Sequence, residues 1–239
     1  MKTLLIALVT TFIVCSLETI DAQSFDIPME GFSRKKTSYF YMEDGSEETG
    51  TLYRLKRKKG LVKEVVLKNE EGDKKSLSPS NIDYMYLPPS KIAKFSAKME
   101  KVSNMDKWDD QTTMDTTLLN EGYVYFEKVK TQVRNKTMDL MLQLMNSAFS
   151  SQIKVYHDPF SQETMSVGVA GIDVAGGLDK SYYIRKVKEE KAYKLHKRDY
   201  KTEFKKLFGD NEAFMEEYAD KVNWNEFDEH VFHYTRMTE

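Results

Sequence analysis

The chain contains almost no cysteine. Its 239 residues include a single one, Cys15, which lies in the apolar stretch near the N-terminus. Residues 23–239 therefore form no disulfide and offer no thiolate for catalysis or metal binding. Their stability has to come from a buried apolar core, and a chain of this length is long enough to build one.

Long apolar runs are also scarce, and the most extended one covers residues 4–15. Two threonines interrupt this run, so it is shorter than the roughly 20 apolar residues that a membrane-spanning helix needs. Lys2 gives a basic start before the run, and Ala22 follows it as a small residue before a cleavage point. This order predicts a signal peptide over residues 1–22 and a mature protein that begins at Gln23.

The predicted leader implies an exported protein, located in the periplasm, at the outer membrane or outside the cell. No later segment is apolar enough to predict a transmembrane helix. Cys15 has a second interpretation, as the lipid-modified first residue of a lipoprotein. Val14 stands before it, where lipoprotein signals favour a small residue. Cleavage after Ala22 is therefore the preferred prediction, and lipidation at Cys15 stays open.

An excess of one charge is absent too, because 36 basic and 38 acidic residues leave a net charge of −2. Basic residues gather at 54–59 beside Tyr53, which is a pattern that nucleic-acid-binding surfaces can show. The aromatic residues alternate with the charged ones here, so we expect them to face the core and the lysines to face water. Residues 185–206 are basic and residues 210–229 acidic, and we interpret both as solvated surface. We therefore predict no nucleic-acid partner.

Alternating apolar and polar residues predict a small antiparallel β module over residues 23–89. Asp44-Gly45 is a turn signal between two β-prone segments, and Pro79 after Ser78 predicts a short helical turn. A pair of prolines marks the expected end of this module. The expected strands are residues 38–42, 51–56, 65–68 and 84–87.

Residues 90–198 are expected to form a second β-rich portion. A strand is expected from Tyr123 through Val133, and further strands at residues 153–156, 182–185 and 192–195. Two segments stay open between helix and strand: residues 91–102, and residues 138–145, where leucine and methionine favour a helix and the flanking strands favour a sheet.

Residues 199–239 predict a helical segment. Asp199 is the expected cap of a first helix that ends at Gly209, and Asp210 the expected cap of a second. Asn223 and Glu226 form a capping-box-like start for a last helix. The expected apolar stripes are Phe204, Leu207 and Phe208; Phe214, Tyr218 and Val222; and Phe227, Val231 and Tyr234. The predicted fold class is α+β, with antiparallel β-rich N-terminal and central portions and a C-terminal cap of two or three helices.

Glu226, His230 and His233 are the sharpest candidates for a chemical site. At 3.6 residues per turn they share one stripe of the last helix, and glutamate and histidine are zinc ligands. Histidines near a helix C-terminus are also favoured by the helix dipole, and residues beside a buried stripe are often structural. We prefer the structural interpretation, and we predict no catalytic, cofactor-binding or metal-binding residue.

Other catalytic patterns are missing from the sequence. The glycines of residues 167–178 lack the Gly-Lys-Ser/Thr of a phosphate-binding loop, and the chain has no Gly-x-Ser-x-Gly or His-Glu-x-x-His. A pair of glycosidase carboxylates stays open, since tertiary distance rather than sequence spacing sets such a pair.

Two stretches of the sequence have a familiar pattern. The first consists of residues 148–159, 171–177 and 180–183, and the second of residues 200–210 and 224–234. Together they resemble an uncharacterised family of secreted proteins from Bacteroidota-type bacteria. The resemblance implies an envelope or extracellular location and an α+β fold. It carries no assigned activity, so no catalytic residue is transferred. Members often have cysteine where this chain has Asn211.

These observations predict an exported protein of the cell envelope or the extracellular space. The preferred hypothesis is a non-enzymatic binding or structural module that meets an unknown protein or envelope ligand through its β surfaces, without a cofactor. The alternative is a hydrolase of envelope or extracellular polymers, with a site of scattered carboxylates or of the Glu226, His230 and His233 stripe.

Overall fold

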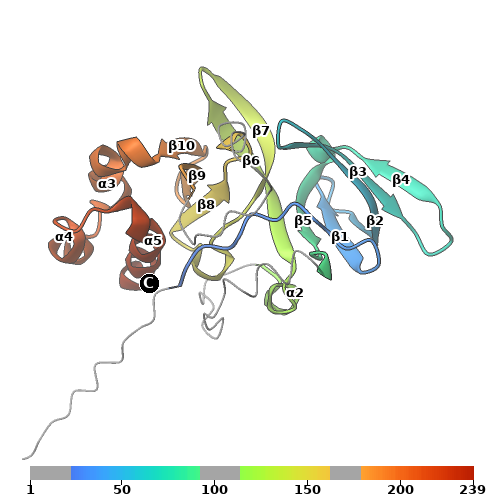
Figure 1. Cartoon of the computed structure of the whole chain (residues 1–239), viewed down its shortest axis with the longest axis horizontal. Helices are drawn as coiled ribbons and strands as arrows, with labels where there is room; N and C mark the ends of the chain where they lie inside the picture. The colour runs from blue at the N-terminus through green and yellow to red at the C-terminus, as the bar shows by residue number, and fades with distance from the viewer. Residues whose placement is uncertain (1–22, 92–113, 162–178) are drawn as a thin grey trace, which may run out of the picture.

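The computed structural model describes residues 23–91, 114–161 and 179–239 (Figure 1). These residues form two antiparallel sheets and a group of C-terminal helices, which confirms the α+β prediction and the helical cap. None of the helices in these ranges is both long and apolar enough to cross a membrane. Residues 92–102 of the open segment and the glycines of residues 167–178 lie outside the described residues.

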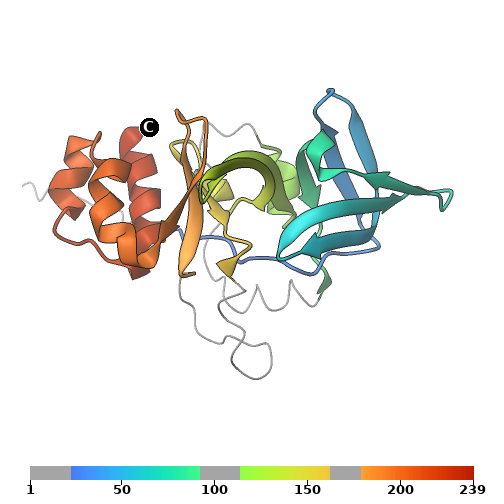
Figure 2. The same cartoon turned by 90° about the horizontal axis from the view of Figure 1, so that it is seen from above.

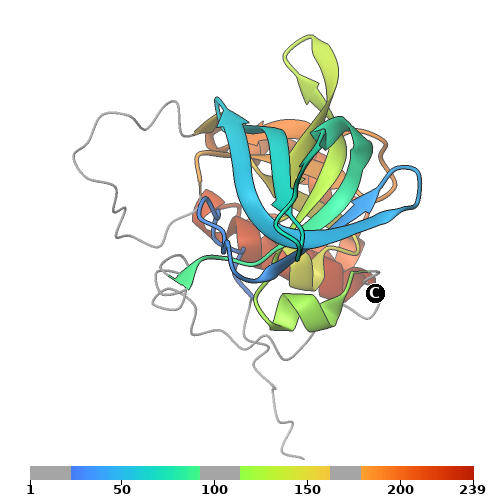
Figure 3. The same ribbon diagram turned by 90° about the vertical axis from the view of Figure 1, so that its right-hand side faces the viewer.

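The first sheet has seven strands in the order β4-β3-β2-β1-β5-β6-β7, and each neighbouring pair is antiparallel. Its strands are β1 (Thr37–Met42), β2 (Glu47–Lys58), β3 (Leu61–Lys68), β4 (Lys74–Leu77), β5 (Ile82–Leu87), β6 (Val124–Val133) and β7 (Lys136–Gln143). The short helices of this part are η1 (Pro79–Asn81) and α2 (Thr116–Asn120). The sheet curls until β3 and β7 come into contact, as the end-on view of Figure 3 shows.

The open segment 138–145 is mostly a strand. β7 pairs with β6 over its whole length, so that each Leu and Met side chain has a place on a sheet face. Pairing and burial therefore outweigh the helix propensity of these residues. β5 and β6 are also hydrogen-bonded neighbours. The boundary expected between residues 89 and 90 thus falls inside one continuous sheet.

Tyr53 corrects one expectation from the sequence. Leu52 pairs with Leu67 and Arg54 pairs with Val66, which leaves Tyr53 as the extra residue of a β-bulge. The bulge turns its ring to solvent, where 41% of the residue is exposed and the Lys74 ammonium lies 3.9 Å from the ring centroid. The alternation that predicted a core-facing Tyr53 fails because the strand is interrupted at this residue.

The second sheet has the order β10-β9-β8 and joins the first at both edges. Its strands are β8 (Ile153–His157), β9 (Ser181–Lys186) and β10 (Tyr193–His196), with η2 (Ser147–Phe149) before them. Leu144 bridges to Tyr156 at one edge, and Thr131 bridges to Ala192 at the other. Strands β6, β7, β8, β9 and β10 therefore form a closed ring around buried side chains, including Leu142.

The helices cover the outer face of the second sheet, at the opposite end of the molecule from β1–β4 (Figure 2). They are η4 (Lys197–Asp199), α3 (Tyr200–Phe208), α4 (Glu212–Tyr218), η5 (Trp224–Glu226) and α5 (Phe227–Thr238). The predicted stripe of Phe227, Val231 and Tyr234 is buried, as expected.

Asp210 is not the cap of α4, contrary to the sequence prediction. Asn211 takes this role, and its side chain accepts a hydrogen bond from the Phe214 amide at 3.0 Å. Asp210 instead accepts hydrogen bonds from Lys186 of β9 and from the Tyr234 hydroxyl of α5. It therefore ties the helical cap to the sheet.

An N-terminal segment, residues 25–33, runs along both sheets. Phe25 is buried against the helical cap, and the Asp26 amide donates to the Met145 carbonyl. The Gln143 side chain then accepts from the Met29 amide at 2.8 Å and donates to the Ile27 carbonyl at 2.9 Å. The segment thus connects the core of the helical end to the first sheet.

Gly60 sits in the tight turn between β2 and β3, where the chain touches Pro159. Lys59 and Gly60 both have positive φ, 52° and 73°, which is typical of a type I′ hairpin turn. A Cβ on Gly60 would lie 2.1 Å from the Pro159 carbonyl oxygen, so the contact leaves no room for a side chain.

We expect Gly60→Ala to destabilise the protein by roughly 3 kcal/mol, since a left-handed conformation and a backbone clash add together. Gly45→Ala is the matched control, because Gly45 has φ of 82° and a Cβ added there would have nothing within 4 Å. It should lose only about 1–2 kcal/mol. Urea unfolding measures both, and equal losses would show that the contact with Pro159 carries no cost.

Candidate functional site

Glu226, His230 and His233 share a helix stripe but lie in different surroundings. His230 is 1% exposed, and its Nδ1 lies 2.7 Å from the Tyr200 hydroxyl. Its Nε2 is 3.9 Å from a Glu226 carboxylate oxygen, which is longer than a hydrogen bond. His233 instead stacks on Tyr218, with ring centroids 5.5 Å apart. Within the described ranges, no group of three or more His, Cys, Asp or Glu residues is placed to hold a metal ion.

His230 is packed among aromatic rings of the helical cap. Phe204, Phe214 and Tyr218 meet it edge-on. Burial lowers the pKa of His230 to about 4, although Glu226 raises it in part. A neutral imidazole in this cluster supports the structural interpretation of His230.

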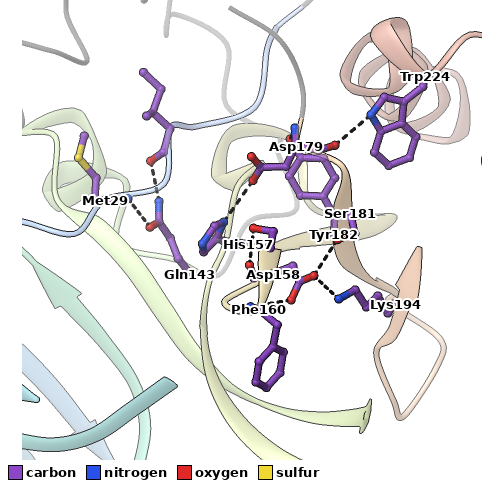
Figure 4. A network of polar contacts seen from close by, with 12 residues as sticks. Met29, Gln143, His157, Asp158, Phe160, Asp179, Ser181, Tyr182, Lys194 and Trp224 are labelled. Carbon is purple, nitrogen blue, oxygen red and sulfur yellow. Dashed lines mark hydrogen bonds and ion pairs between the residues drawn. The ribbon is translucent and has the colours of Figure 1, made fainter. Parts of the chain in front are cut away.

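Asp158 forms the centre of a buried polar network (Figure 4). Its side chain is 0% exposed. One carboxylate oxygen accepts from the Phe160 amide at 2.9 Å, and the other accepts from the Ser181 hydroxyl at 2.7 Å and lies 2.5 Å from the Lys194 ammonium. A carboxylate so fully occupied and removed from solvent fixes β8, β9 and β10 to one another and has no open position for a substrate.

His157 is the residue before Asp158 in the chain and faces a different neighbour. Its Nδ1 lies 3.3 Å from an Asp179 carboxylate oxygen, and both side chains are partly exposed. The Asp179 backbone accepts from the Trp224 indole and donates to the Tyr182 hydroxyl, so the pair rests on the helical cap and on β9 (Figure 4).

A shallow hollow lies beside this pair, lined by His157 together with Met29, Arg57, Gly60 and Gln143, among others. Its volume of about 30 Å³ is far below the roughly 300–1,000 Å³ of small-molecule pockets. The hollow can hold water, but it does not enclose a metabolite.

Six tyrosines of three neighbouring strands and the turn before β6 share one face of the first sheet. This tyrosine face consists of Tyr39, Tyr41, Tyr84, Tyr86, Tyr123 and Tyr125. Directly opposite residues of antiparallel strands lie side by side on one face. Tyr41 pairs with Glu47 on one side and with Tyr84 on the other, and Tyr84 pairs with Glu127. Glu47, Tyr41, Tyr84 and Glu127 therefore form a row across β2, β1, β5 and β6.

Tyr41 and Tyr84 are two of the partly buried rings of this face. Their centroids are 4.4 Å apart and their planes differ by 14°, so the two rings stack. Tyr86 meets both of them edge-on and is itself buried, with a hydroxyl that accepts from the Asp115 amide at 2.8 Å. The stacked pair is only partly buried and rests on a rigid base of buried tyrosine.

The charged groups that act on the stacked pair are acidic. The pKa of Tyr84 is raised by burial and by the nearby charges of Asp83 and Glu47. The pKa of Tyr41 is raised by burial and, next, by Glu47. At the other end of the row, Glu127 is held by the Lys154 ammonium at 2.9 Å and by the Tyr156 hydroxyl at 2.5 Å.

The sequence contained a signal for this face that the strand prediction did not use. Tyrosines recur at every second position in Tyr39–Tyr41, in Tyr84–Tyr86 and in Tyr123–Tyr125. Side chains two residues apart in a strand share a face. Three such pairs therefore indicate an aromatic face, but only the strand order places them side by side.

Comparisons with protein-family models, with curated proteins and with solved structures find no match to this chain. The tyrosine face is the candidate functional site, because its two stacked rings combine a rigid base with partial exposure.

Acid should weaken the fold through His230. Its folded pKa of about 4 lies below the ordinary histidine value of 6.5, so the unfolded chain binds the proton first as the pH falls. The free energy of unfolding is therefore highest above pH 6.5 as far as His230 is concerned. It falls by about 3 kcal/mol at most as the pH drops from 6.5 to 4.

Urea unfolding of the wild type and of His230→Phe at several pH values tests this expectation. The difference in unfolding free energy between the two proteins should shift in favour of the variant as the pH falls through this window. His233 and Asp228 titrate in both proteins, so their own contributions are common to both; the charge of His233 also lowers the pKa of His230, and this coupling exists only in the wild type. A difference that is independent of pH would contradict the buried neutral imidazole.

Asp158→Ala should destabilise the protein by about 3–5 kcal/mol, because it leaves the Lys194 ammonium and the Ser181 hydroxyl without their buried partner. Asp73→Ala, at an exposed turn position, is the control and should change stability by about 0.5 kcal/mol or less. Thermal and urea unfolding measure both variants. A small loss for Asp158→Ala would show that this network does not hold the strands together.

Proposed function

We propose that this chain is an exported, non-enzymatic binding protein of the cell envelope or the extracellular space, and that its ligand contacts the tyrosine face. The observation that carries the proposal is the stacked pair of Tyr41 and Tyr84, which is only partly buried on a rigid sheet. Tyrosine supplies a large contact area at a low cost in side-chain entropy, and binding surfaces are enriched in it.

The position of the pair in the sheet supports this role. β1 and β5 are central strands with partners on both sides, so their backbone groups are already paired. A ligand therefore meets side chains rather than a free strand edge. Side chains held by a sheet and by a buried tyrosine beneath them are fixed before the ligand arrives, which favours affinity.

The N-terminal segment supports the proposed export. Phe25 is buried in the helical core only two residues after the predicted mature start at Gln23. Cleavage after Ala22 would leave this anchor intact. Residues 23–239 also contain no cysteine, so the proposed mature protein folds equally in an oxidising or a reducing compartment.

A hydrolase of envelope or extracellular polymers is the second candidate function. The His157 and Asp179 pair favours it, because a histidine oriented by a carboxylate is the arrangement of a general base. Ser181 is a hydroxyl on the neighbouring strand β9, but it is buried and donates to Asp158. The binding function therefore has the stronger support.

A binding panel tests the proposed function. Purified residues 23–239 are titrated with soluble polymers of different chemistry: a neutral glucan, an acidic polyuronate, chitosan oligomers, and basic, neutral and acidic peptides. We expect at least one class to bind and Tyr41→Ala/Tyr84→Ala to weaken it at least tenfold, since two aromatic contacts are lost. Isothermal calorimetry gives the affinities, and circular dichroism checks the fold.

Tyr53→Ala is the matched control, because it removes an exposed tyrosine from another part of the same sheet. Its affinity should equal that of the wild type. Binding that survives the loss of Tyr41 and Tyr84, or failure of every class to bind, would refute the proposal. Breakdown of a polymer that stops in His157→Asn would favour the hydrolase instead.

A further inference from the structure

The acidic residues beside the stacked tyrosines indicate the charge of the ligand. Glu47 lies directly opposite Tyr41 in the β1–β2 pair. Asp83 is the extra residue of a bulge in β5, where Tyr41 pairs with Tyr84 and Met42 pairs with Ile82. The bulge leaves Asp83 next to Tyr84 and exposed to solvent.

These two carboxylates differ from the third acid of the row. Glu127 is already matched by Lys154, by the Tyr156 hydroxyl and by Arg185, whose guanidinium lies 3.6 Å away. Glu47 and Asp83 form no ion pair with any residue in the described ranges. Each ring of the stacked pair therefore has a neighbouring acid without an ion-pair partner in the described ranges: Glu47 lies opposite Tyr41, and Asp83 precedes Tyr84 in the chain.

Resting on the proposed function above, we infer that the tyrosine face takes an arginine side chain of a partner polypeptide. The guanidinium lies flat against the ring of Tyr41 or Tyr84 and donates hydrogen bonds to Glu47 or Asp83. Tyr41 and Glu47 are directly opposite in the β1–β2 pair, and such side chains stand about 5 Å apart, so one guanidinium reaches the Tyr41 ring and the Glu47 carboxylate together.

Arginine fits this arrangement better than lysine does. Its planar group stacks on aromatic faces and can still donate two parallel hydrogen bonds to a carboxylate. A lysine ammonium is a strongly hydrated point charge that gains less from a flat ring. The negative surroundings also disfavour nucleic acids and acidic polysaccharides, which would be repelled by Glu47 and Asp83.

The chain already contains a contact of this kind in another place. The Arg57 guanidinium lies 5.7 Å from the centroid of the Phe32 ring and donates to the Met29 and Glu30 carbonyls. An arginine that stacks on a ring while it bonds to oxygen atoms is thus a contact that this fold already makes elsewhere.

Fluorescence anisotropy with labelled peptides tests the inference. The probes are peptides in which arginine, lysine, glutamine or glutamate alternates with glycine and serine. We expect the arginine peptide to bind best, the lysine peptide more weakly, and the other two not at all. Glu47→Gln/Asp83→Asn should weaken the arginine peptide about tenfold, and raising the salt concentration should weaken it further.

Glu71→Gln is the matched control, because Glu71 is an exposed acid in the turn between β3 and β4. Its affinity should stay within about twofold of the wild type, on the scale of about 1.4 kcal/mol for each tenfold change. Circular dichroism confirms that all variants fold. Equal affinity for the arginine and glutamine peptides, or for the wild type and Glu47→Gln/Asp83→Asn, would overturn the inference.

The failure of this inference can be told apart from the failure of the proposed function. If a neutral glucan or chitosan binds through Tyr41 and Tyr84 while the arginine peptide does not, the binding function stands and the arginine assignment is wrong. If nothing binds through these tyrosines, both are wrong.

Discussion

The pairing of β6 with β7 is the constraint on which the rest of the structure depends. These two strands belong to the seven-stranded sheet, and they also close the ring with β8, β9 and β10. Apolar side chains of this two-stranded β6–β7 ribbon therefore contribute to two cores. Val129 and Leu140 face the ring, while Phe126 and Met141 face the curled first sheet. The second sheet is attached to these two strands at both of its edges, through the Leu144–Tyr156 and Thr131–Ala192 bridges.

Polar contacts fix how the other elements rest on this ribbon. Asp158 joins the ends of β8, β9 and β10, Gln143 holds the N-terminal segment, and Asp210 attaches the helices to β9. Each of these side chains has partners from segments far apart in the sequence. Buried or half-buried polar groups of this kind are costly unless satisfied, so they favour one arrangement of the elements over others.

The tyrosine face differs from these polar contacts, because not all of its groups are buried or paired. The fold buries Tyr86 and Tyr125 completely or almost so, yet it leaves Tyr41 and Tyr84 partly exposed, beside acids that have no ion-pair partner within the described ranges. The aromatic residues at the helical end of the molecule pack against one another in a buried core, with a neutral His230 among them. The two aromatic clusters therefore differ in exposure: the rings at the helical end form a packed core, whereas Tyr41 and Tyr84 remain accessible, as the proposed ligand contact requires.

The sequence by itself determined most of the secondary structure of the N-terminal module and of the helical end, because turn residues, alternation and helical stripes act over a few neighbouring residues. Strand β4 (Lys74–Leu77) was not among the expected strands. Three features needed the tertiary structure. Residues 138–143 became a strand only because β6 offers partners, and Tyr53 faces solvent only because a bulge shifts its register. The row of Glu47, Tyr41, Tyr84 and Glu127 exists only because the chain places β5 between β1 and β6. Local patterns specify which way a side chain points within its own strand, whereas the order of strands decides which side chains meet.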